Sequence, residues 1–106
     1  MPKYLLEASY LAEGAKGLLK DGGSKRRAAA RTLVESLGGK IDCFYFAFGK
    51  TDVVAVVDMP DSVSAAAASL AISASGAVTG RVTVLLTPEE IDQAAKKTAK
   101  YTPPGK

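Results

Sequence analysis

The sequence predicts an α+β protein with the ferredoxin-like β-α-β-β-α-β order, in which an antiparallel four-stranded sheet carries helices on one face and an extra helix follows at the C-terminus. Three observations predict this class. Four segments have the apolar pattern of strands, segments of helical period separate the first from the second and the third from the fourth, and a short turn joins the second to the third.

The first strand and the first crossover are predicted from residues 4–39. Residues 4–10 alternate with a period of two, which indicates a strand. The apolar residues that follow share one helical face: Leu11, Ala15, Leu18 and Leu19. Gly22 and Gly23 break this helix, Ser24 is expected to cap a second one, and Gly38-Gly39 is expected to end it with a left-handed residue. The crossover is therefore predicted to be a helix in two pieces.

A hairpin and a second crossover are predicted from residues 41–86. The apolar runs 41–48 and 52–58 are separated by a short turn, which predicts two adjacent strands. Pro60-Asp61-Ser62 supplies a turn and a helix cap. The helix that follows is expected to bury the face formed by Val63, Ala67, Leu70 and Ala74. Residues 78–86 alternate again and predict the fourth strand.

The C-terminal region divides into a helix and a tail. Thr87-Pro88-Glu89-Glu90 combines a threonine cap, proline at the first helical position and a glutamate that completes a capping box, so a short helix is predicted over residues 88–98. Residues 99–106 have no apolar period. We therefore expect one domain over residues 1–98 and a flexible basic tail over residues 99–106.

Composition narrows the function classes. The 106 residues include no histidine, no tryptophan and one cysteine, which excludes histidine-based metal sites, Ser-His-Asp and Cys-His catalysis, histidine-ligated haem and an intrachain disulfide. No metal and no cofactor are therefore expected. The net charge is +3, but several lysines lie near the C-terminus, so the folded part is nearer neutral and nucleic acid is not expected as a partner.

The same residues predict where the protein works. No apolar run approaches the roughly 20 residues that span a bilayer, and the N-terminus lacks the pattern of a secretory signal. A cytoplasmic location without a membrane partner is expected, and the lone Cys43 agrees with a reducing compartment.

The strands of the hairpin are apolar on both faces, which predicts self-association. The helix-free face is expected to carry a hydrophobic interface formed by Phe44, Phe46, Phe48, Val54 and Val56. An exposed patch of this kind exceeds what a monomer usually tolerates, so a second copy is expected to cover it, sheet against sheet, as a homodimer or higher oligomer. The alternative is that the helix over residues 88–98 folds back over this face.

A basic cluster is the candidate ligand site. Lys25, Arg26 and Arg27 fall in the first turn of the second helical piece, where the helix dipole disfavours cations. Together with the flexible Gly22-Gly23 they suit a small anion such as phosphate or carboxylate, or an acidic patch on a neighbouring subunit. The alternative is a solvated basic helix end, and the spacing is not that of a P-loop.

Asp52 and Tyr45 are the candidates for acid–base chemistry. Asp52 at the mouth of a barrel, close to Tyr45 or to Lys50, is able to act as a general base. In the competing interpretation Asp52 accepts backbone N–H groups of the turn, and Tyr45 is an amphipathic sheet residue.

Several segments, in this order and spacing, resemble the GYD domain family. They are Gly38-Gly39-Lys40, Phe44-Tyr45-Phe46-Ala47-Phe48, Gly49-Lys50-Thr51-Asp52, Met59-Pro60-Asp61 and Leu86-Thr87-Pro88-Glu89-Glu90-Ile91. Gly49 and Asp52 match the Gly-Tyr-Asp signature, with Thr51 where an aromatic residue is usual. The resemblance implies a small bacterial or archaeal protein that assembles as a dimeric α/β barrel, and it implies no particular reaction.

Two functions follow as hypotheses. The first is a non-catalytic homo-oligomer that serves as an assembly module or binds a small anionic ligand. The second is a cofactor-independent enzyme in which a cavity between sheet and helices holds an organic substrate and Asp52 or a tyrosine moves a proton. RNA binding ranks last, because the third strand lacks the aromatic residues on which RNA-recognition domains of this strand order stack bases.

Overall fold

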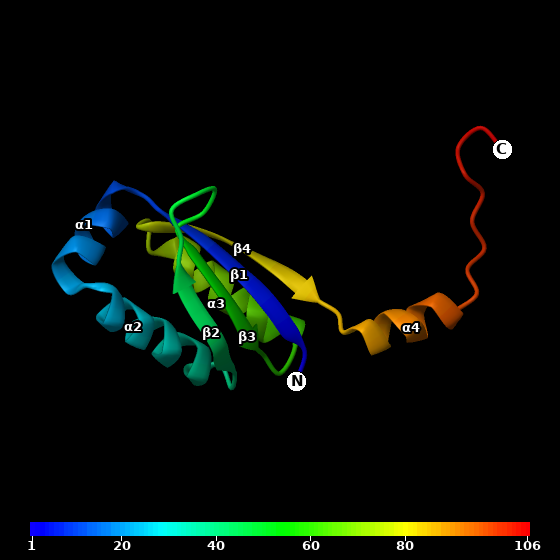
Figure 1. Cartoon of the computed structure of the whole chain (residues 1–106), viewed down its shortest axis with the longest axis horizontal. Coiled ribbons are helices and arrows are strands. Elements are labelled where there is room, and N and C mark those ends of the chain that lie inside the picture. Colours follow the sequence, from blue (N-terminus) through cyan, green and yellow to red (C-terminus); the bar gives the residue numbers. More distant parts are fainter.

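The computed structural model describes all 106 residues and contains the predicted elements in the predicted order (Figure 1). They are β1 (Lys3–Tyr10), α1 (Ala12–Asp21), α2 (Gly23–Ser36), β2 (Lys40–Phe46), β3 (Val53–Asp58), α3 (Ser62–Ala74), β4 (Val78–Leu85) and α4 (Pro88–Lys96). The first crossover is a helix in two pieces, as predicted.

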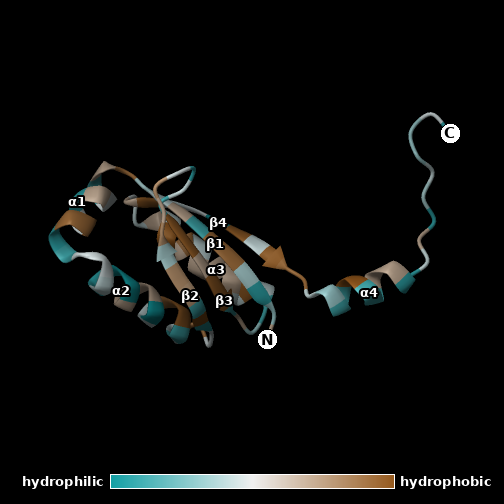
Figure 2. Ribbon diagram, in the orientation of Figure 1, coloured by the Kyte–Doolittle hydropathy of each residue, from teal (hydrophilic) through white to brown (hydrophobic).

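The four strands form one antiparallel sheet in the order β2-β3-β1-β4. This order confirms the predicted ferredoxin-like α+β class. Helix α2 packs on β2 and helix α3 packs on β4. Side chains of both helices line one space together with side chains of the two central strands, so both helices lie on the same face of the sheet. Figure 2 shows hydrophobic residues running along the strands and α3, whereas hydrophilic residues are frequent on α2.

The helix ends follow the predicted chemistry with one exception. The Asp61 carboxylate accepts the Ser64 N–H at 2.7 Å, and Thr87 and Glu90 form the predicted capping box of α4. Gly38 has φ +83°, and the Gly39 N–H donates to the Val34 carbonyl oxygen at 3.0 Å, which ends α2 as expected. The prediction that Ser24 caps α2 is wrong, because the N-cap is Gly22 at φ +80° and the helix begins at Gly23, two residues earlier than predicted.

The buried core is small and lies where β1 and β3 meet the two long helices, α2 and α3. Its members are Tyr4, Val34, Val57, Met59 and Ala65. The Tyr4 hydroxyl lies 3.1 Å from the Ser62 Oγ, so the first strand is tied to the start of α3 by a polar contact as well as by packing.

Helix α3 is rotated relative to the prediction. Its buried residues are Ala65 and Ala68, while Val63 and Leu70 are 79% and 70% exposed. Because this helix has no charged residue, its sequence does not indicate which side faces the sheet. Ala65 and Ala68 pack on the sheet and Ile72 lines the space above it, whereas Val63 and Leu70 point to solvent.

A β-bulge in β2 corrects the predicted interface. The register shifts between Ile41, which pairs with Val57, and Cys43, which pairs with Val56. Beyond the bulge Phe44 pairs with Ala55, and Phe46 pairs with Val53. Paired residues point to the same face, so both rings lie with the buried residues of β3 on the helix face.

The predicted set Phe44, Phe46, Phe48, Val54 and Val56 therefore does not share one face. Val54 and Val56 are on the helix-free face, opposite Phe44 and Phe46, and Phe48 is fully exposed in the hairpin loop. The rings of Phe44 and Phe46 contact each other edge to face, with centroids 5.4 Å apart.

The C-terminal helix does not fold back over the sheet. Figure 1 shows α4 beyond the end of β4, and none of its residues is buried. The radius of gyration is 16.8 Å, whereas a compact chain of this length has about 13 Å. The interpretation in which the helix over residues 88–98 covers the sheet is therefore wrong for the single chain, and residues 97–106 contain no helix or strand.

Candidate functional site

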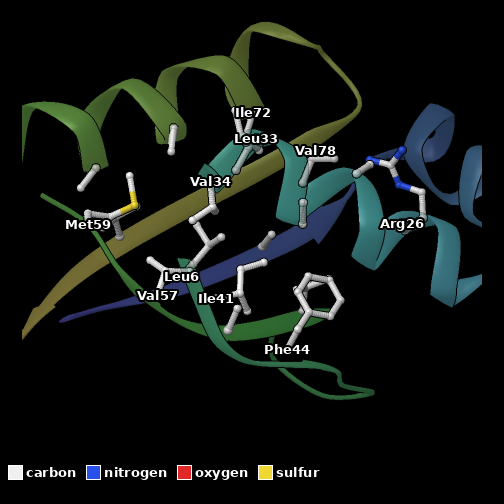
Figure 3. A pocket seen from close by; sticks show the side chains of 18 of the residues that line it. Leu6, Arg26, Leu33, Val34, Ile41, Phe44, Val57, Met59, Ile72 and Val78 are labelled. Atoms are coloured by element: carbon white, nitrogen blue, oxygen red, sulfur yellow. The ribbon is translucent and has the colours of Figure 1, made fainter. Parts of the chain in front are cut away.

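A cavity of about 130 Å³ lies between the sheet, α2 and α3 (Figure 3). Eighteen of its 19 lining residues are hydrophobic, and the nineteenth is Arg26. An apolar cavity of roughly 150 Å³ accepts a benzene-sized molecule. The space therefore matches a ligand body of about that size.

The cavity exists because small side chains occupy its walls. Each long helix packs on an outer strand, so the centre of the sheet lies beneath the gap between α2 and α3. Alanines line this gap from both helices and both central strands: Ala8, Ala29, Ala30, Ala55, Ala65 and Ala68. Residues of this size do not reach across the gap, and the space stays open.

Arg26 supplies the one charge of this site, at one end of the cavity (Figure 3). Its side chain is 39% exposed, and its Nη1 lies 4.0 Å from the Asp21 Oδ2. This separation exceeds hydrogen-bond distance, so the guanidinium donors are free for another acceptor. Aromatic rings lie at the same end: Phe44 lines the cavity, and the Phe46 ring packs against Gly23 in the first turn of α2.

The three predicted cations do not act together in this chain. Lys25 and Arg27 are exposed and do not line the cavity, whereas Arg26 turns inward. The helical period explains the separation, because neighbours in a helix point in directions about 100° apart.

Asp52 and Tyr45 are not brought together. The Asp52 carboxylate accepts the Tyr10 N–H at 2.8 Å, where it ties the hairpin to the end of β1. Tyr45 pairs with Val54 on the helix-free face and is 68% exposed. Neither residue lines the apolar cavity. Asp52 thus has a structural contact, though with β1 rather than with the N–H groups of its own turn.

The helix-free face carries an ion cluster at one end. Lys3 donates to Asp42, the extra residue of the bulge, and its Nζ also lies 3.0 Å from the Asp58 Oδ1. The hydrogen bonds to Asp42 and Asp58 raise the pKa of Lys3. The hydrogen bond from Lys3 lowers the pKa of Asp42. A separate polar hollow on this face includes Glu7 of β1 and Arg81 of β4, which lie directly opposite each other in the sheet.

Of the residues that line the cavity, only Arg26 and Phe44 were predicted as site residues, and neither was predicted for this place. The sequence does contain a signal of the cavity, namely the alanines on the sheet-facing sides of α2 and α3, but an alanine-rich helix equally predicts close packing. The difference depends on how far apart the two helices lie, which no local pattern records.

No group of three or more cysteine, aspartate or glutamate side chains is placed to hold a metal ion. Among the helices, none combines the length and the apolar character that crossing a membrane requires.

The fold and the site define a small ferredoxin-like α+β protein with an apolar cavity between its helices and its sheet. Residues 4–95 match the GYD domain family, which covers nearly the whole chain before the tail, and the protein belongs to this family. No curated protein and no solved structure matches the chain.

Proposed function

We propose that this GYD-domain protein is a non-catalytic, self-associating module of the cytoplasm that binds a small organic molecule in the cavity between α2, α3 and the sheet. The observation that carries the proposal is the cavity itself, which is apolar apart from Arg26. A binding role fits better than acid–base catalysis because Asp52 and Tyr45 lie elsewhere.

The cavity is also a place where packing is incomplete. Its small side chains leave the walls without partner atoms on one side, so dispersion contacts are missing there. A bound ligand that fills the space supplies these contacts and stabilises the folded protein.

The sequence also predicts an anionic ligand at Lys25, Arg26 and Arg27. Of these three residues only Arg26 borders the cavity, so it alone supports an anionic ligand there.

The test is whether a small apolar probe binds inside this space. We expect toluene to shift the amide resonances of Ala55 and Ala68 in two-dimensional NMR spectra, because both residues line the cavity. The variant Ala68→Leu fills the space and is expected to abolish these shifts. The control Ala71→Leu adds the same side chain at an exposed position of α3 and leaves binding intact. Toluene binding that survives Ala68→Leu, or no binding to the native protein, contradicts the proposal.

Self-association is proposed through the helix-free face of the sheet, with a second copy of the chain as the occupant. Its central residues are apolar: Leu5, Cys43, Tyr45, Val54 and Val56. The charged residues around them are three basic and three acidic ones: Lys3, Lys40, Arg81, Glu7, Asp42 and Asp58. Two identical copies therefore meet without net charge repulsion, and about 800 Å² per copy is the standard size of a stable interface.

A further inference from the structure

We propose that the ligand of the cavity is a monocarboxylate with a benzene-sized apolar body, whose carboxylate binds the Arg26 guanidinium. This inference rests on the proposed function, because it names the class of molecule that the same cavity takes.

The cavity offers a separate environment to each part of such a ligand, apolar walls for the body and one cation for the head. Hydrophobic side chains form every wall except at Arg26, so a ligand with several polar groups loses their hydration without compensation. One charged group at one end suits a molecule with one polar head. The volume of about 130 Å³ limits the body to roughly one ring or a short branched chain.

The state of the guanidinium favours a carboxylate as that head. Arg26 has one acidic neighbour, Asp21, at 4.0 Å, and the two are not hydrogen-bonded. Both groups also lie at unfavourable ends of their helices, because Asp21 is the last residue of α1 and Arg26 is in the first turn of α2. A bound carboxylate that accepts two parallel N–H bonds gives Arg26 the partner that Asp21 does not supply.

Phosphate is disfavoured by the same geometry. A phosphate needs several donors, and Lys25 and Arg27, the nearest cations in sequence, are exposed and outside the cavity lining. A planar carboxylate needs only the one guanidinium fork that the site offers.

The experiment compares benzoate with benzamide, which has the same shape and no charge. Both are titrated against the 15N-labelled native protein, and Kd values are taken from the shifts of the cavity amides. We expect benzoate to bind at least tenfold more tightly than benzamide, and inorganic phosphate to leave the cavity amides unshifted.

Variants assign the difference to one side chain. Arg26→Gln is expected to weaken benzoate at least tenfold and to change benzamide less than twofold. Lys25→Gln and Arg27→Gln are the matched controls and leave both ligands unchanged. Asp21→Asn removes the competing carboxylate and is expected to tighten benzoate.

The outcomes separate the two proposals. Equal Kd values for benzoate and benzamide, or equal weakening of both by Arg26→Gln, overturn the carboxylate inference. If toluene still binds in the cavity, the proposed function stands. If Lys25→Gln or Arg27→Gln weakens benzoate as much as Arg26→Gln does, the assignment to Arg26 is wrong. If toluene, benzamide and benzoate all fail to bind the folded native protein, both proposals fail.

Discussion

Asp42 shows how one residue changes the face to which the side chains of a strand point. It is the extra residue of the bulge in β2, and the alternation restarts after it. Ile41 therefore lies on the helix face together with Phe44, although strict alternation places them on opposite faces. The bulge also brings the Asp42 carboxylate to Lys3, two strands away.

The contacts of Lys3 predict a pH-dependent stability. The pKa of Asp42 is lowered from 3.8, so its contribution is present above that value and is lost as the pH falls through the folded pKa. The pKa of Lys3 is raised from 10.5, so its contribution is present below that value and is lost as the pH rises through the folded pKa. Urea unfolding is therefore expected to show the largest destabilisation by Lys3→Met between about pH 5 and pH 9.5.

The control for this experiment is Lys50→Met, in the exposed hairpin loop. Its effect is expected to be small at every pH. A Lys3→Met variant whose unfolding midpoint runs parallel to that of the native protein from pH 2 to pH 7 contradicts the assignment.

At the scale of elements, the ends of the helices were more predictable from the sequence than the faces that the helices and strands bury. The caps of α3 and α4 and the left-handed end of α2 are local hydrogen-bonding patterns, and the sequence predicted them correctly. The buried face of α3 was predicted wrongly because apolar residues surround this helix on all sides. Its orientation is decided by closeness of approach, which favours Ala65 and Ala68 over Val63 and Leu70.

Helix α1 offers a matched pair of substitutions at the same scale. A Cβ at Gly14 contacts the Ala77 carbonyl oxygen too closely, and that oxygen accepts the Leu11 N–H at 2.9 Å. A Cβ at Gly17 meets no atom within 4 Å. Gly14→Ala is therefore expected to destabilise the protein by about 1–3 kcal/mol, and Gly17→Ala to stabilise it by up to about 1 kcal/mol.

Urea titrations of both variants measure these changes. Opposite shifts of the unfolding midpoint at equal m-values support the close packing of α1 against the start of β4. Stabilisation by both substitutions shows that α1 does not pack there.

For the whole molecule, the uncovered side of the sheet is the feature that most affects behaviour in solution. Helix α4 does not cover it, and the polar surroundings of the apolar centre carry balanced charge. Sedimentation at micromolar concentration is expected to show a particle of twice the 11.0 kDa chain mass. The double variant Tyr45→Lys/Val54→Lys places two cations at the centre of the face and is expected to sediment as a monomer.

Leu70→Lys is the control for this measurement, because Leu70 lies on the outward face of α3 and is 70% exposed. It is expected to leave the dimer intact. A native chain that sediments as an 11.0 kDa particle shows that the sheet face does not self-associate. If Leu70→Lys alone dissociates the dimer, the interface is formed by α3 and not by the sheet face.

The sequence by itself determined the order of elements, most of their boundaries and the ferredoxin-like class, because these depend on local periodicity, capping groups and turn residues. Tertiary structure alone decided which side of β2 and α3 is buried, the separation of α2 from α3, and the inward turn of Arg26 without Lys25 and Arg27. The physical reason is that a bulge, a packing distance and a cavity arise from several segments meeting in space. A pattern read along one segment does not contain the positions of the others.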